Sequence, residues 1–268
     1  MITNTMIAKA NAAVEILISK NYKAEVTTIN KNGVEKLGIS IGEGSVRSVL
    51  YPNYDKSIEN IVQYVIDGYD YSKTVASQDV LTNIANEFTD FDRIKDMIVP
   101  YLTKAIIPEV ATHTYLDLNV YYRMVNGDYS ILIKNEHLRH WGITEEQLFL
   151  KAKDNIKNKI LIEDMVDILP APFTIGMKRG VMRVATTEDK RYGSSTLLLT
   201  EFLEEKSNGK DLFILPSSIH EVIIIDADNN DAKELANIIT SVNSSQLKAE
   251  EIMSDHPYLY SHGEIKEA

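Results

Sequence analysis

The stretch LFILPSSIHEVIIID, residues 212–226, predicts a β-hairpin and sets the expected fold. Apolar strand-forming runs at 212–215 and 222–226 flank a polar segment that begins at Pro216. Because proline cannot donate to a β-ladder, the first strand is expected to end there, and the serines that follow can bond to the backbone of the turn. The next strand is then expected to begin at about His220.

The segments around this hairpin follow a strand-strand-helix order. Before it we expect strands at 181–187 and near 195–199 and a helix at 200–207. After it we expect a helix at 231–242, whose inward face would be Leu235, Ile238, Ile239 and Val242. Two such units in succession predict an α+β protein, with a largely antiparallel sheet or sheets that carry helices packed on one face.

Hairpins are also predicted in the N-terminal part of the chain. Asn32-Gly33 and Asn126-Gly127 each separate alternating segments, and this dipeptide is a strong hairpin signal because both turn positions need positive φ. Between them, the segment 115–125 alternates throughout and predicts one continuous strand.

Several helices are predicted in the same part of the chain, two of them by the following signals. The first has apolar residues at helical spacing, which form one buried stripe: Met6, Ile7, Ala10, Ala13, Val14, Leu17 and Ile18. The second opens at Thr144, which forms a capping box with Gln147.

The stretch LPAPF, residues 169–173, contains two prolines two positions apart, which disfavours helix and favours an extended connection. We expect a boundary between two subdomains here. They would be an N-terminal α+β region at 1–168 and a C-terminal ββαββα region at 173–268, which can also pack as one continuous domain.

Composition limits the kind of protein this can be. With 268 residues, 44% of them apolar, the chain is long enough to bury a proper core. Acidic residues outnumber basic ones 39 to 28, and a net charge of −11 repels phosphate backbones, so direct nucleic-acid binding is disfavoured. The charge suits solubility, a basic protein partner, or imitation of a nucleic acid. Imitation is the weakest of these, because the acidic residues are scattered among lysines.

The absence of cysteine excludes disulfides, thiolate nucleophiles, iron–sulfur clusters and cysteine-ligated zinc. The first 20 residues lack a basic start and a continuous apolar run, and no 18-residue apolar stretch occurs. We therefore expect a soluble, cytoplasmic protein without a membrane anchor.

The polar part of the 212–226 hairpin offers a possible catalytic site. Ser217 or Ser218 could act as a nucleophile with His220 as its base, and Glu221 is a nearby carboxylate. In an extended strand, however, Ser218 and His220 would lie about 7 Å apart on one face while Glu221 points away. No GxSxG elbow surrounds the serines. A structural turn is favoured, and a hydrolase is the alternative.

A metal site is only weakly indicated. His137 and His140 are three residues apart on an expected short helix, close enough to share an ion if further ligands come from elsewhere. The HExxH arrangement is absent, and surface histidines are common. We therefore predict neither a metal nor another cofactor.

Two further groups of residues are candidate binding sites. One is a mixed polar row on one face of the strand at 115–125, formed by Asp117, Asn119, Tyr121 and Arg123. It could bind a ligand or partner, or bond to neighbouring strands and solvent. The other is the C-terminal SDHPYLYSHGE, with Asp255, His256, Tyr258, Tyr260 and His262, in which the two tyrosines would share a strand face.

Several stretches, in order, resemble domain-of-unknown-function family 5688, a family of uncharacterised bacterial proteins from Clostridia-type Firmicutes. They are GISIGEGSVRSVLYPNY, YLDLNVYYRM, NEHLRHWGI, LFILPSSIHEVIII and MSDHPYLY, from about residue 38 to 260. The most specific are LPSSIHEV and SD-x-x-Y-x-Y, here Ser254, Asp255, Tyr258 and Tyr260. After SD, where the family often has valine, this chain has HPY. The resemblance implies an association with mobile elements and no established activity, fold or cofactor.

Together these observations predict a non-enzymatic protein that binds a protein partner or acts as a regulatory factor. A hydrolase that uses Ser217 or Ser218 with His220 is the alternative, and an acidic nucleic-acid mimic is a weaker one. Composition sets neither the partner nor the oligomeric state.

Overall fold

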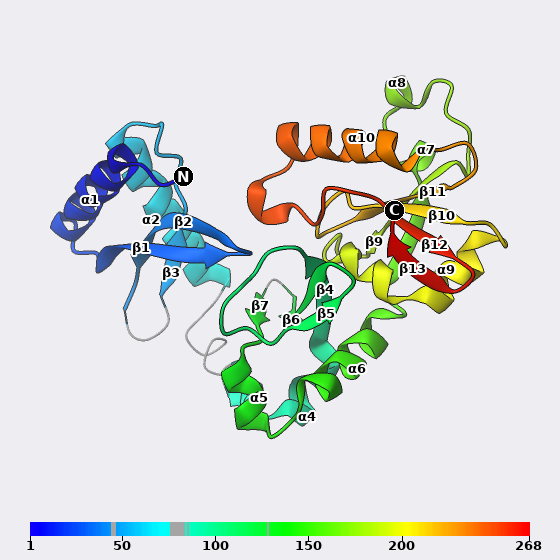
Figure 1. Ribbon diagram of the computed structural model, residues 1–268. Coiled ribbons are helices and arrows are strands. Elements are labelled where there is room, and N and C mark those ends of the chain that lie inside the picture. Colours follow the sequence, from blue (N-terminus) through cyan, green and yellow to red (C-terminus); the bar gives the residue numbers. More distant parts are fainter. Residues whose placement is uncertain (44–46, 76–83, 85, 128) are drawn as a thin grey trace. The chain divides into compact units, whose positions relative to one another are not determined.

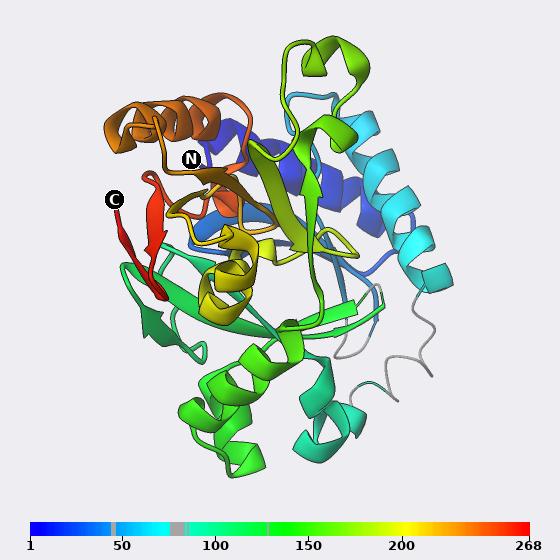
Figure 2. The ribbon, with the colours of Figure 1, turned by 90° about the vertical axis from the view of Figure 1, so that its right-hand side faces the viewer.

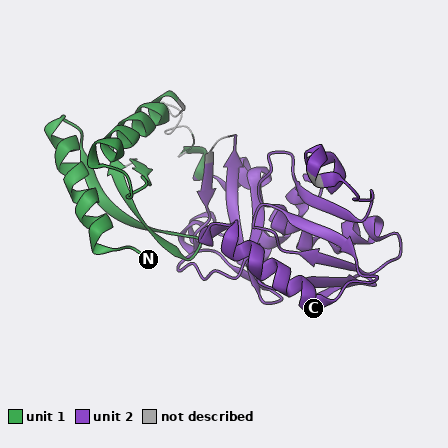
Figure 3. Ribbon diagram, turned by 90° about the horizontal axis from the view of Figure 1, so that it is seen from above, with its two compact units in different colours: residues 1–88 green, residues 89–268 purple. Residues whose placement is uncertain are grey.

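A computed structural model of the chain describes residues 1–43, 47–75, 84, 86–127 and 129–268. The chain forms two compact units, unit 1 at 1–88 and unit 2 at 89–268 (Figure 3). The boundary expected at 169–173 lies inside unit 2.

Unit 1 is a three-stranded antiparallel sheet with two helices against it. Its elements are α1 (Asn4–Ser19), β1 (Ala24–Lys31), β2 (Val34–Ile41), β3 (Ser48–Leu50) and α2 (Ile58–Val75), and the strand order is β1-β2-β3. The turn predicted at Asn32-Gly33 is confirmed, with φ of 50° and 81°. Residues from both helices and from β2 form one buried core, so the helices cover one face of the sheet.

Unit 2 contains two sheets, and the first is built around one long strand. Its elements are α4 (Phe91–Ile94), η1 (Lys95–Met97), β4 (Ile98–Thr103), β5 (His113–Tyr115), β6 (Leu118–Asn126), β7 (Tyr129–Leu132), α5 (Asn135–Trp141) and α6 (Glu145–Ile156). β6 pairs with β4 along one edge and with β5 and β7 along the other, all antiparallel. The capping box of Thr144 and Gln147 is confirmed at the start of α6.

The continuous strand predicted at 115–125 is wrong. Leu116 has a φ of 54°, so the chain turns at 116–117 and β5 folds back onto β6. Leucine rarely adopts this left-handed backbone, and the apolar–polar alternation runs through the turn without interruption. As a result Asp117 lies in a turn, while Asn119, Tyr121 and Arg123 stay on the strand.

The second sheet of unit 2 has six antiparallel strands in the order β13-β12-β10-β11-β9-β8. They are β8 (Ile160–Asp164), β9 (Met182–Thr187), β10 (Leu212–Leu215), β11 (Val222–Asp226), β12 (Tyr258–Ser261) and β13 (Glu264–Glu267). The hairpin predicted at 212–226 is confirmed as β10 and β11, with Leu212 opposite Asp226. Helix α10 (Ala232–Ser245) covers one face (Figure 1). Because side chains alternate along a strand, the buried Leu212, Ile214 and Ile224 belong to the opposite face, which is therefore covered too.

The strand predicted near 195–199 is also wrong. This segment belongs to a buried 3₁₀ helix, η2 (Gly193–Leu198), followed by α9 (Thr200–Ser207). The Ser194 hydroxyl accepts a hydrogen bond from the Leu102 N–H of β4 at 2.9 Å, and the Gly193 N–H donates to the His220 carbonyl at 2.9 Å. η2 thus joins the two sheets of unit 2.

The excursion between β8 and β9 holds α7 (Met165–Ile168) and α8 (Ala171–Thr174) (Figures 1 and 2). A last short helix, η3 (Ala249–Glu251), precedes β12. The extended connection predicted at 169–173 is replaced in part by α8, which contains Pro172 in its first turn. Proline is tolerated there because the first N–H groups of a helix have no intrahelical partner.

The predicted α+β class is confirmed by the three antiparallel sheets and the helices of the described residues. Over the same part of the chain, no helix combines the length and the apolar character that crossing a membrane requires.

Candidate functional site

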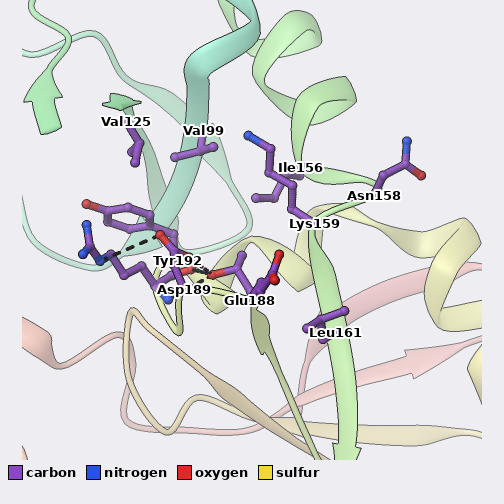
Figure 4. Close-up of a pocket in the computed structure, with 11 residues that line it drawn as sticks. Val99, Val125, Ile156, Asn158, Lys159, Leu161, Glu188, Asp189 and Tyr192 are labelled. Carbon is purple, nitrogen blue, oxygen red and sulfur yellow. Dashed lines mark hydrogen bonds and ion pairs between the residues drawn. The ribbon is translucent and has the colours of Figure 1, made fainter. Parts of the chain in front are cut away.

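Unit 2 contains a pocket of about 410 Å³, shown in Figure 4. Its apolar lining is Val99 of β4, Val125 of β6, Ile156 of α6 and Leu161 of β8. The polar lining residues are Asn158, Lys159, Thr187, Glu188, Asp189, Arg191 and Tyr192. Four of these, Glu188, Asp189, Arg191 and Tyr192, come from the loop between β9 and η2. The pocket therefore has an apolar wall and a charged rim.

Hydrogen bonds to Thr187 fix the rim loop. The Arg191 N–H donates to Thr187 Oγ1 at 3.0 Å, and the Thr187 hydroxyl lies 2.5 Å from Asp189 Oδ1. The Arg191 and Asp189 side chains approach at 3.8 Å as a loose ion pair. Among the described residues, Lys159 and Glu188 form no ion pair, and both are exposed, so their charges are open to a ligand.

A row of aromatic rings stands behind Tyr192. The Tyr192 ring lies 5.6 Å from that of Tyr101, which lies 5.8 Å from that of Tyr121. On the other side, the His220 ring lies 6.0 Å from Tyr192. Burial raises the pKa of Tyr101 to about 12, against the opposing effect of the Arg123 guanidinium. Three predicted site residues, Tyr121, Arg123 and His220, thus lie in or against an aromatic row that includes the pocket residue Tyr192. Sequence patterns did not predict this pocket.

The two serines of the hairpin turn are bonded within the turn. Ser218 Oγ accepts from the His220 backbone N–H at 3.0 Å, and the Ser218 N–H donates to the Glu221 carbonyl at 3.0 Å. The Ser217 hydroxyl donates to Glu221 Oε1 at 3.3 Å. These contacts favour the structural interpretation of the turn.

Replacing Ser218 with alanine is expected to lower the free energy of unfolding by about 1–2 kcal/mol, because the half-buried His220 N–H loses its acceptor, the hydroxyl of the buried Ser218. Ser217→Ala, whose bond is long and exposed, should change it by less than about 0.5 kcal/mol. Urea unfolding of both variants measures the difference, and equal effects would contradict this account of the turn.

Asp117 is the centre of a network that joins the two sheets of unit 2. Its carboxylate accepts from Tyr258 Oη at 2.8 Å, His256 Nε2 at 3.0 Å and Lys104 Nζ at 3.0 Å. Lys104 also binds Asp255 at 2.6 Å. Burial alone would raise the pKa of Asp117, but the hydrogen bonds from His256, Tyr258 and Lys104 outweigh it and hold the pKa below its usual value. The structure thus brings together four residues of the two predicted groups, Asp117, Asp255, His256 and Tyr258.

The other predicted polar residues bond to nearby parts of the fold. Tyr121 Oη donates to the Ala105 carbonyl at 2.8 Å and accepts from the Ile107 N–H at 2.9 Å, and Asn119 donates to the same carbonyl at 3.2 Å. The Arg123 guanidinium donates to Ser130 Oγ at 3.0 Å. Tyr260 donates to the Glu204 carboxylate.

The histidines predicted as weak metal candidates have separate roles. His137 Nδ1 accepts from the Lys134 N–H at 3.0 Å and so caps α5, and burial lowers the pKa of His137. His140 is exposed. Among the described residues, the groups of side chains that could hold a metal ion do not include either one; these groups are His113 with Glu145 and Glu146, and Asp117 with His256 and Glu267.

Comparison with known proteins identifies the family of this chain. Residues 3–262 match the model of a family of unknown function, DUF5688, which confirms the resemblance carried by the sequence motifs. Neither the curated proteins nor the solved structures yielded a match.

Proposed function

Because the chain belongs to DUF5688, a family of unknown function, we propose a function from its structure: it is a protein-binding factor whose pocket in unit 2 receives an apolar side chain of a partner protein. The observation that carries the proposal is the pocket itself, with an apolar wall beside the exposed charges of Lys159 and Glu188. Its volume of about 410 Å³ falls within the range of roughly 300–1,000 Å³ of ligand-binding pockets.

The position of β8 supports an extended partner segment. β8 is the last strand of the six-stranded sheet, and its Leu161, which lines the pocket, is 45% exposed. A partner segment can pair with the outer edge of such a strand through main-chain hydrogen bonds and place one side chain in an adjoining pocket. A few side chains buried in pockets supply most of the binding energy in many interfaces.

Charge favours a basic partner. The chain carries a net charge of −11, which attracts basic proteins over the range set by ionic screening. The proposal also includes a regulatory role, a bacterial source and a link to mobile elements. These three points rest on the family resemblance alone.

The two alternative functions have less support. The Ser217 and Ser218 hydroxyls bond inside their turn, which does not favour a nucleophile. Acidic residues such as Asp117 and Asp226 pair with lysines, which does not favour a row of free charges that imitates phosphates.

Leu161→Asp is expected to weaken binding of the partner at least tenfold, because it places a charge on the apolar wall of the pocket. The partner is first identified by a photo-crosslinking residue at position 161 in a lysate of the source organism, and the purified partner is then titrated by calorimetry.

Ile175→Asp is the matched control, since Ile175 is an apolar residue of the same unit, 85% exposed, and does not line the pocket. The affinity of Ile175→Asp for the partner should stay within about twofold of the affinity of the original protein. Equal weakening by the two variants, or capture of a small molecule instead of a protein at position 161, would overturn the proposal.

A further inference from the structure

Two groups of side chains in unit 2 place an imidazole next to carboxylates. The first is His113, Glu145 and Glu146, and the second is Asp117, His256 and Glu267; in each, one potential ligand atom per residue lies within 4.8 Å of the others. Both groups thus have the atoms and the spacing from which protein metal sites are made.

The two groups differ in how their negative charge is balanced. In the second, Lys104 Nζ lies 3.0 Å from the Asp117 carboxylate and supplies a positive charge. In the first, no lysine or arginine within the described part of the chain forms an ion pair with Glu145 or Glu146. The ion-pair partner of Glu145 is His113, whose Nδ1 lies 3.1 Å from Glu145 Oε2 and which is charged only when protonated.

The first group is also held in position by its surroundings. The His113 ring stacks on that of Phe149, with centroids 4.0 Å apart and planes 14° apart. The buried Tyr122 hydroxyl donates to Glu145 Oε1, which leaves Oε2 directed to His113. Contacts of this kind fix the orientation of metal ligands in proteins.

From this we infer that His113, Glu145 and Glu146 bind a divalent transition-metal ion of the zinc class. One imidazole nitrogen and two carboxylate oxygens are a ligand set that zinc accepts, and three protein ligands leave a position open for water or for a group of a bound molecule. His113 belongs to β5 and the glutamates open α6, so the ion would link a strand to the helix packed against it.

Zinc titration by calorimetry, together with metal analysis after dialysis, tests this site. Glu146→Gln removes an exposed ligand that makes no bond to Tyr122, so the variant should fold normally. It is expected to bind Zn²⁺ at least tenfold more weakly than the original chain. Cobalt substitution gives a second readout, an absorption spectrum of nitrogen and oxygen ligation that the variant should lose.

Glu267→Gln is the matched control, because it makes the same change in the group that Lys104 already neutralises. Its zinc affinity should remain within about twofold of the original chain. The inference is overturned if the original chain binds no zinc in the micromolar range, or if both variants lose affinity equally.

Discussion

Gly193→Ala is expected to destabilise unit 2 by about 3 kcal/mol or more, because the added methyl group has no room. A Cβ at this position would lie 2.5 Å from the His220 carbonyl oxygen, 2.7 Å from that of Ala185 and 2.8 Å from Thr186 Cα. All three are backbone atoms, so they cannot move aside as the end of a side chain can. The same His220 oxygen accepts bonds from Gly193 and Thr186, which a shift would break.

The measurement is urea unfolding followed by tryptophan fluorescence. Trp141, the only tryptophan, lies in α5 and therefore reports on unit 2. Gly209→Ala is the control: its Cβ would meet nothing within 4 Å, and its φ of +76° should cost only about 1–2 kcal/mol. Similar stabilities for the two variants would show that the backbone around Gly193 does not pack tightly enough to exclude a methyl group.

Asp117→Ala is expected to lower the free energy of unfolding by about 2–4 kcal/mol. The change leaves the fully buried Tyr258 without the acceptor of its hydroxyl, and Lys104 and His256 lose their shared carboxylate. Asp255→Ala removes another partner of Lys104, but the Asp255 side chain is 66% exposed. Its loss should cost no more than about 1 kcal/mol, and equal costs would contradict the central position of Asp117.

The same network should make stability depend on pH. The pKa of Asp117 is lowered in the folded chain, so its contribution is present above the usual aspartate pKa, about 4, and is lost as the pH falls through the lowered value. Between neutral pH and about pH 3, unfolding measurements should therefore show a smaller loss of stability for Asp117→Ala than for the original chain. Parallel curves for the two proteins would contradict this assignment.

Local signals predicted much of the fold. The Asn-Gly turn at 32–33, the capping box at Thr144 and the hairpin at 212–226 are each determined by a few neighbouring residues, and all three are confirmed. The elements that the sequence did not predict correctly are determined by tertiary packing. The apolar run near 195–199 has the composition of a strand, but the close fit of Gly193 against the sheet turns it into η2.

Burial was predicted less well than element type. Of the inward face expected for the helix at 231–242, Leu235 and Ile239 are buried, whereas Ile238 is 56% and Val242 36% exposed. The buried face of α10 is narrower than the spacing of its apolar residues suggests, because only the row with Leu235 and Ile239 packs against the sheet. The pocket was missed for a similar reason: its lining comes from separate segments whose proximity no local pattern encodes.

Contacts in unit 2 join residues that are far apart in the sequence, and this separation affects how the chain folds while it is being synthesised. Unit 1 pairs β1 with β2 across a two-residue turn, so this hairpin can close soon after it is made. Asp117 and Tyr258, by contrast, are 141 residues apart, which at bacterial and eukaryotic elongation rates corresponds to roughly 7–28 s. Throughout that interval Asp117 and the turn that carries it lack their partners from β12, so surface that is buried in the folded chain stays exposed on the ribosome, where chaperones protect such surface.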